Sequence, residues 1–138
     1  MINFHVEDID FKFQQKLKIK NWLKSIIETE GFKTGDINYI FCSDDYLLKI
    51  NIEYLDHDYL TDIITFDNSE EEELIEGDIF VSIDRVKDNA QGFQVSFEHE
   101  LKRVLAHGVL HLCGYLDKTD EDEKLMRSKE NHYLQLFQ

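Results

Sequence analysis

Two histidines four residues apart are the side chains of this 138-residue chain best placed to do chemistry. They stand in the stretch 107-HGVLHLCGYLD-117, and positions i and i+4 of a helix lie on one face, about one turn apart. Two imidazoles so placed can bind one metal ion, as in the helix H-E-x-x-H of metalloproteases. Gly108 stands where that motif has its glutamate general base. The spacing therefore predicts a metal site and argues against a peptidase.

Asp117 is the third candidate ligand. Gly114 ends the helix three residues after His111, and a carboxylate three residues further on reproduces the return spacing of H-E-x-x-H-x-x-G-x-x-H. Three protein ligands and one open position are typical of a catalytic metal site, where the metal lowers the pKa of its bound water toward neutrality. The alternative is that both histidines only interact with the dipole at the helix C-terminus.

The same stretch resembles the signature H-G-x-L-H-L-x-G-Y-D-H of the YbeY family of endoribonucleases. The similarity extends to 77-GDIFVSID-84, to 61-TDIITF-66, and to Asn51 and Tyr54, which match the family's N-x-x-Y. The resemblance implies a metal-dependent, single-strand-specific endoribonuclease that acts in ribosomal RNA maturation and ribosome quality control. It also implies that the protein binds one zinc ion. The implied partner is ribosomal RNA or a ribosomal particle, with a ribosomal protein as a further possible partner.

The third ligand departs from the family pattern. An ungapped match puts Leu116 on the family's aspartate and Asp117 on its third histidine. Because a carboxylate can replace an imidazole as a zinc ligand, we expect His107, His111 and Asp117 to bind the ion. Two histidines and one carboxylate also describe non-haem iron sites, so another divalent transition metal is an alternative.

Arg103 is the candidate catalytic side chain. The basic residue that often follows the family's N-x-x-Y is Leu55 here, and Arg103, one turn before His107, is the nearest substitute on the helix for holding phosphate. The alternative for Arg103 is an ion pair with Glu100 at i−3.

Asp78 is a candidate to accept a hydrogen bond from a ligand histidine. The remaining histidines have no spacing that ties them to a metal and are expected to be ordinary: His5, His57, His99 and His132.

Hydrophobic periodicity predicts the elements that must position these residues. Strands are expected over 2–6, 37–42, 62–66 and 78–83. Helices are expected over 11–29, 44–55, 84–91, 95–113 and 120–136. The expected N-caps are Ser43, Asp84, Ser96 and Thr119. This order predicts one α+β domain over residues 1–138, with a small mixed sheet of about four strands, helices packed over it, and the metal-site helix at a cleft.

The net charge of −14 opposes non-specific binding to RNA phosphates. Five lysines in the first expected helix offer a local basic patch, although a solvated face is the alternative: Lys12, Lys16, Lys18, Lys20 and Lys24.

The N-terminus lacks a secretory pattern, no stretch is long and apolar enough to span a membrane, and two isolated cysteines suit a reducing compartment. We therefore expect a cytoplasmic hydrolase, with another metallohydrolase or a ribosome-assembly protein holding a structural metal as alternatives.

Overall fold

Alternating apolar residues build one sheet from four strands in the computed structural model, which describes residues 1–137. The strands are β1 (Ile2–Val6), β2 (Lys33–Cys42), β3 (Ile63–Asp67) and β4 (Leu74–Ser82). They lie in the order β1-β2-β4-β3. β2 pairs in parallel with β1 and with β4, and β3 pairs antiparallel with β4. The expectation of a small mixed sheet is confirmed.

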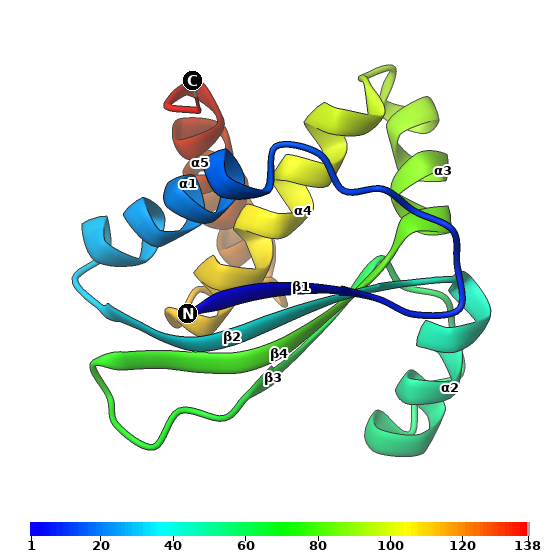
Figure 1. The fold of residues 1–138 in the computed structure, drawn as a ribbon, viewed down its shortest axis with the longest axis horizontal. Coiled ribbons are helices and arrows are strands. Elements are labelled where there is room, and N and C mark those ends of the chain that lie inside the picture. Colours follow the sequence, from blue (N-terminus) through cyan, green and yellow to red (C-terminus); the bar gives the residue numbers. More distant parts are fainter. Residues whose placement is uncertain (138) are drawn as a thin grey trace.

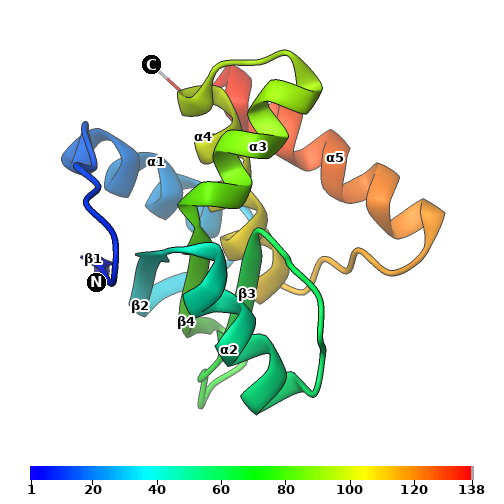
Figure 2. The ribbon, with the colours of Figure 1, turned by 90° about the vertical axis from the view of Figure 1, so that its right-hand side faces the viewer.

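Helices cover both faces of this sheet unequally. They are α1 (Lys16–Thr29), α2 (Asp44–Leu55), α3 (Ile83–Phe93), α4 (Phe97–Leu112) and α5 (Asp120–Gln135). α1, α4 and α5 lie over one face, whereas α2 lies at one end of the other (Figure 1). The N-terminal end of α5 stands away from the sheet (Figure 2). This arrangement confirms the α+β class. None of the helices over residues 1–137 has the length and apolar character that crossing a bilayer requires.

Side-chain caps decide where most helices begin. The expected N-caps Ser43, Ser96 and Thr119 are confirmed, since each side chain accepts the backbone N–H three residues later. The expected cap Asp84 is wrong, because Ser82, two residues earlier along the chain, caps α3. Ser82 also ends β4, so the strand runs directly into the helix, and Asp84 lies in the first turn.

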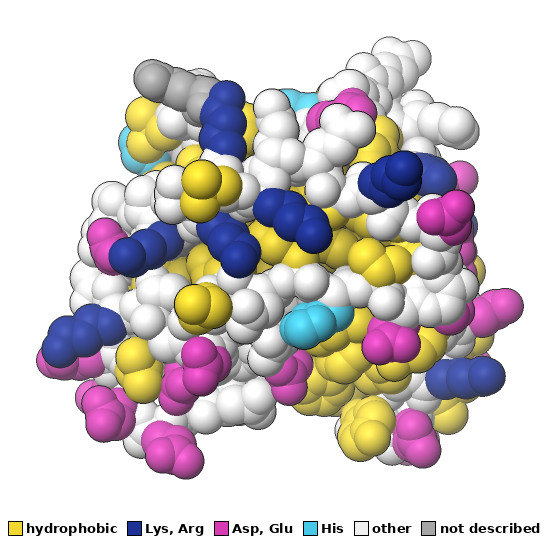
Figure 3. All heavy atoms as spheres, in the orientation of Figure 1, with side chains coloured by type: hydrophobic (Ala, Val, Ile, Leu, Met, Phe, Trp, Pro, Cys, Tyr) yellow, Lys and Arg dark blue, Asp and Glu magenta, His cyan; other side chains and the backbone are white. Residues whose placement is uncertain are grey.

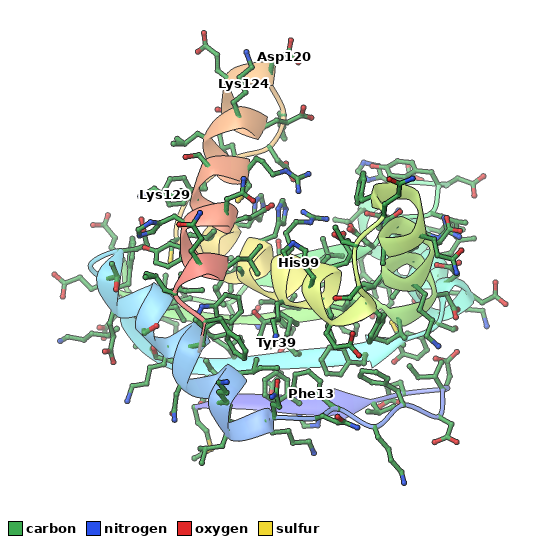
Figure 4. All side chains as sticks on the ribbon, turned by 90° about the horizontal axis from the view of Figure 1, so that it is seen from above. Phe13, Tyr39, His99, Asp120, Lys124 and Lys129 are labelled. Atoms are coloured by element: carbon green, nitrogen blue, oxygen red, sulfur yellow. The ribbon has the colours of Figure 1, made fainter. Side chains whose placement is uncertain are left out.

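The expected first helix is too long at its N-terminal end. α1 begins only at Lys16, and the preceding segment runs over the strands. Phe13 lies beside β1 (Figure 4), with its ring centroid 4.5 Å from that of Phe4 and 4.9 Å from that of Phe41. Phe11 also contacts Phe41, at 5.3 Å. Because Phe11 and Phe13 are two residues apart, extended backbone lets both rings join this aromatic cluster, which helical backbone would separate.

α4 is the helix that carries the two histidines, and it is fixed in the core. Its residues Val104, Leu105, Ala106 and Val109 are at most 1% exposed. Tyr39 reaches up from β2 toward α4 (Figure 4) and donates its hydroxyl to the Leu105 carbonyl oxygen at 2.6 Å. A buried tyrosine hydroxyl that finds such a partner costs little to bury. The position of α4 over the sheet is therefore set by both packing and a hydrogen bond.

The close contact between β3 and β4 generates a prediction about Gly77. A Cβ on Gly77 would overlap the backbone oxygen of Phe66, which cannot move without its strand. We expect Gly77→Ala to lower the free energy of unfolding by about 1–3 kcal/mol. Gly92→Ala is the control, because a Cβ on Gly92 meets no atom within 4 Å. Thermal unfolding measures both variants, and equal melting temperatures would contradict the close contact.

Candidate active site

The C-terminal half of α4 presents His107 and His111 together at a cleft. Their rings are nearly parallel, with an interplanar angle of 5° and centroids 6.3 Å apart. A cavity of about 370 Å³ is lined by both histidines and by Asp117. A second cavity, of about 610 Å³, is lined by His107, Asp117, Arg103 and residues of α5. The structure thus brings Arg103, His107, His111 and Asp117 to the walls of two cavities that share His107 and Asp117.

A buried carboxylate orients His107. Nδ1 of His107 lies 2.7 Å from Oε2 of Glu130, and a carboxylate only accepts, so Nδ1 carries a proton and donates. In the neutral ring the lone pair is then on Nε2, which lies 3.2 Å from Oδ2 of Asp117. A lone pair and a carboxylate repel each other unless a proton or a cation lies between them. This geometry fits a bound cation.

A backbone carbonyl orients His111 in the same way. Nδ1 of His111 donates to the Tyr115 oxygen at 3.0 Å, which leaves the Nε2 lone pair free. Gly114, at a φ of 109°, makes the reversal that returns Tyr115 to the helix end, because glycine adopts this conformation without strain. Hydrogen bonds of this kind, from the nitrogen that does not bind metal, are how proteins fix ligand histidines.

Arg103 is occupied by carboxylates. Its Nε donates to Glu100 at 2.9 Å and its Nη1 to Glu130 at 3.0 Å, while Nη2 also contacts Glu100. The ion pair that was the alternative interpretation is therefore present. Arg103 is 9% exposed, and it lines the larger cavity. It reaches the metal-site residues through Glu130, which it shares with His107.

Negative charge exceeds positive charge around His107 and Arg103. The nearby carboxylates are those of Asp62, Glu100, Asp117 and Glu130. Burial lowers the pKa of His107, but the hydrogen bond to Glu130 and the surrounding carboxylates outweigh it, and the pKa is raised. Burial raises the pKa of Glu130, but the bond to His107 and the Arg103 charge bring that pKa below its usual value. The carboxylates stabilise the charged form of His107, and the positive charges of His107 and Arg103 stabilise the charged form of Glu130.

The donor set fits a metal ion once Asp117 turns toward it. Within residues 1–137 no three His, Cys, Asp or Glu side chains already converge at metal-binding spacing. The two imidazoles are oriented, however, and the Asp117 side chain is 44% exposed, which leaves its rotation free. Asp117 is not the cap of α5, because Thr119 and Asp122 form that capping box. The carboxylate is thus available as a ligand.

Gly108 faces the sheet, and a larger residue there would have to displace neighbouring side chains. A Cβ there would lie 3.1 Å from two side-chain carbons of Ile79 and 3.2 Å from one of Ile63. A glutamate at this position would be driven into the core and away from the cavities. The fold therefore agrees with the sequence in arguing against the general base of a metallopeptidase.

Two expectations about individual residues need correction, and one residue was missed. Asp78 does not contact a ligand histidine, because its oxygens accept from Asn38 and Asn68, each at 3.2 Å. His57 is not remote from the candidate ligands, because it lines the smaller cavity with them. The missed residue is Glu130, although a glutamate on the buried stripe of α5 signals a buried partner.

Comparisons with known proteins show which family the chain belongs to. The family model for the endoribonuclease YbeY matches residues 1–138. A relative with that name from Flavobacterium psychrophilum is 57% identical over 137 residues, which cover 99% of this chain and 96% of the relative. Another, from Porphyromonas gingivalis strain ATCC 33277, is 42% identical over 99% of this chain and 90% of the relative.

A solved structure supports the fold independently. The solution structure of a Thermotoga maritima protein matches with a TM-score of 0.66 and 32% identity, over 98% of this chain and 87% of that one. The resemblance inferred from the histidine stretch is therefore confirmed along the whole length. The chain belongs to the YbeY family of endoribonucleases.

Proposed function

We propose that this chain hydrolyses phosphodiester bonds of single-stranded RNA with one zinc ion bound by His107, His111 and Asp117. The observation that carries the proposal is the pair of oriented imidazoles, whose Nδ1 atoms are held by Glu130 at 2.7 Å and by the Tyr115 carbonyl at 3.0 Å. Residues 1–138 act as one catalytic domain in the cytoplasm, in ribosomal RNA maturation and ribosome quality control.

The protein residues have distinct roles in this proposal. Glu130 keeps His107 in the tautomer that presents Nε2, and the Tyr115 carbonyl does the same for His111. When bound, a zinc ion would polarise a phosphoryl oxygen and lower the pKa of a water molecule bound to it. Asp117 adds negative charge where an imidazole would be neutral, so it makes the ion a weaker Lewis acid. The same donors also suit another divalent transition metal.

The substrate is presented on a ribosomal particle in this proposal, with ribosomal proteins as further contacts. The net charge of −14 is too unfavourable for strong binding to free RNA through phosphates alone. Positive side chains gather over α1, while acidic side chains gather at the loop between β3 and β4 (Figure 3). A substrate held by a larger assembly does not depend on the surface charge of this chain for its affinity.

RNA cleavage with metal removed and restored tests the proposal. We expect a chelator to abolish cleavage of a single-stranded RNA by the purified protein, and zinc to restore it. His111→Ala should lose at least about 100-fold in kcat/KM, because a ligand is removed. His99→Ala is the control, since His99 is exposed on the same helix (Figure 4). A wild-type protein that binds zinc but leaves RNA intact would favour the structural-metal alternative.

The metal affinity of Asp117 variants tests the third ligand. Asp117→Ala should weaken zinc binding at least tenfold, roughly the effect of losing a coordinating partner, and Asp117→His should restore it. The reason is that the Gly114 turn sets the geometry while residue 117 supplies only the donor atom. Asp120→Ala, at the start of α5 (Figure 4), is the carboxylate control. Competition with a chelating dye measures the zinc affinity of wild type and the three variants. Equal affinities in wild type and Asp117→Ala would mean that only the two histidines bind the ion.

Arg103 variants separate a positioning role from direct contact with phosphate. Arg103→Ala removes the arginine that Glu100 and Glu130, both 1% exposed, share, and it leaves Glu100 without its ion pair, so we expect a loss of about 3–5 kcal/mol in stability. Arg127→Ala is the control, because Arg127 is half-exposed and lies 3.6 Å from Glu130; it should cost under about 1 kcal/mol. Urea unfolding measures both. A fully stable Arg103→Ala protein with reduced turnover would instead support phosphate binding.

A further inference from the structure

The loop that follows α2 carries two stacked rings into the smaller cavity. The rings of His57 and Tyr59 lie 5.1 Å apart at an interplanar angle of 21°, and the Tyr59 hydroxyl lies 3.0 Å from His57 Nδ1. Both residues line the cavity that His107, His111 and Asp117 also line. Nothing in the proposed mechanism uses them.

Asn51 holds this loop in place. Asp56 ends α2 in the left-handed conformation, at a φ of 55°, and turns the chain toward the cavity. The His57 N–H then donates to the Asn51 carbonyl oxygen at 3.1 Å. The Asn51 side chain, 1% exposed, donates to the Tyr59 carbonyl oxygen at 2.9 Å. The backbone that carries both rings is therefore bonded to the end of α2 at two points.

The loop and the end of α2 expose an unusual amount of apolar surface. Tyr59 is 57% exposed although the hydrogen bond to His57 fixes its direction. Other large apolar side chains nearby are also exposed: Ile52, Leu55 and Leu60. Clustered exposed hydrophobic residues mark contact surfaces. A flat ligand with an apolar face suits the Tyr59 ring.

The charge of the cavity indicates which ligand this is. Among its lining residues Lys118 is the single Lys or Arg, and Asp117 is negative. RNA affinity at this place cannot rest mainly on phosphate contacts. Stacking of a base on an aromatic side chain is worth roughly 5- to 150-fold in affinity per base and does not need charge. Only unpaired bases present their faces in this way, because those of a double helix are stacked on one another.

We propose that the stacked pair His57–Tyr59 is a platform that binds one nucleobase of single-stranded RNA next to His107, His111 and Asp117. The platform positions the strand along the cavity and excludes paired RNA. This inference rests on the proposed function and adds the part of the substrate that is recognised, which is the face of an unpaired base.

Short single-stranded RNA containing 2-aminopurine tests the platform, because stacking quenches the fluorescence of this base. We expect wild-type protein to quench it, and Tyr59→Ala to lose the quenching and to raise Kd and KM about 5- to 150-fold with kcat little changed. Tyr59→Phe keeps the ring and should behave as wild type. Tyr54→Ala is the matched control, because Tyr54 is 67% exposed on α2 but lines a different cavity. Unchanged melting temperatures confirm that the variants fold.

The outcomes separate the platform from the proposed function. Equal quenching, Kd and KM in wild type and Tyr59→Ala would overturn the platform while leaving cleavage intact. The opposite result is also distinguishable. If wild type quenches the fluorescence and Tyr59→Ala does not, but wild type cleaves no RNA with any metal, the platform is supported and the proposed function is overturned. A Tyr59→Ala protein that loses binding to ribosomal particles but not to RNA would assign the loop to a protein partner and overturn the platform.

Discussion

The buried carboxylate of Glu130 connects the core of the protein to its reactive face. One oxygen accepts from Nδ1 of His107 at 2.7 Å and the other from Nη1 of Arg103 at 3.0 Å. A carboxylate that is 1% exposed is costly to bury unless both oxygens have charged or polar partners. Those partners lie on α4 while Glu130 lies on α5, so the crossing of the two helices and the tautomer of His107 depend on the same group. The capping box at Thr119 fixes where α5 begins.

A second carboxylate, which is partly buried, ties the turn after α4 to the rest of the fold. Glu30, at the end of α1, accepts from the hydroxyls of Tyr115 and Tyr133 and from the ammonium of Lys129. Burial raises the pKa of Glu30, but these donors outweigh it and bring the pKa below its usual value. Because the Tyr115 carbonyl orients His111, the second imidazole also depends on a contact between helices. Both ligand histidines are therefore positioned by groups outside α4.

The sequence could predict what is local and could not predict what packing brings together. The spacing of His107 and His111 within one helix, and caps such as Ser96, follow from residues a few positions apart. The segment before Lys16 was predicted as helix because Phe11 was taken to continue the helical spacing of the apolar residues from Leu17 on, and only contact with the strands shows that it does not. The partners of Arg103 include one local carboxylate, which was foreseen, and Glu130, 27 residues away, which no periodicity reveals.

The position of His57 in the cavity is of the same kind. It follows α2 in a loop, and its nearness to the candidate ligands on α4 depends on how β3 packs against that helix.

Electrostatics links metal binding to RNA binding at this site. Asp62, Asp117 and Glu130 surround the imidazoles with negative charge, and a phosphodiester brings one more. At a few ångströms such charges repel each other by several kcal/mol outside bulk water, roughly 4 kcal/mol for a pair 4 Å apart at an effective dielectric constant of 20. In the proposed mechanism, a divalent cation between the candidate ligands would offset this repulsion, so it would serve the approach of a phosphate as well as the hydrolysis. The proposed platform of His57 and Tyr59 would attract a base without adding charge, and an acidic protein could then hold a polyanion at a place where a cation neutralises it.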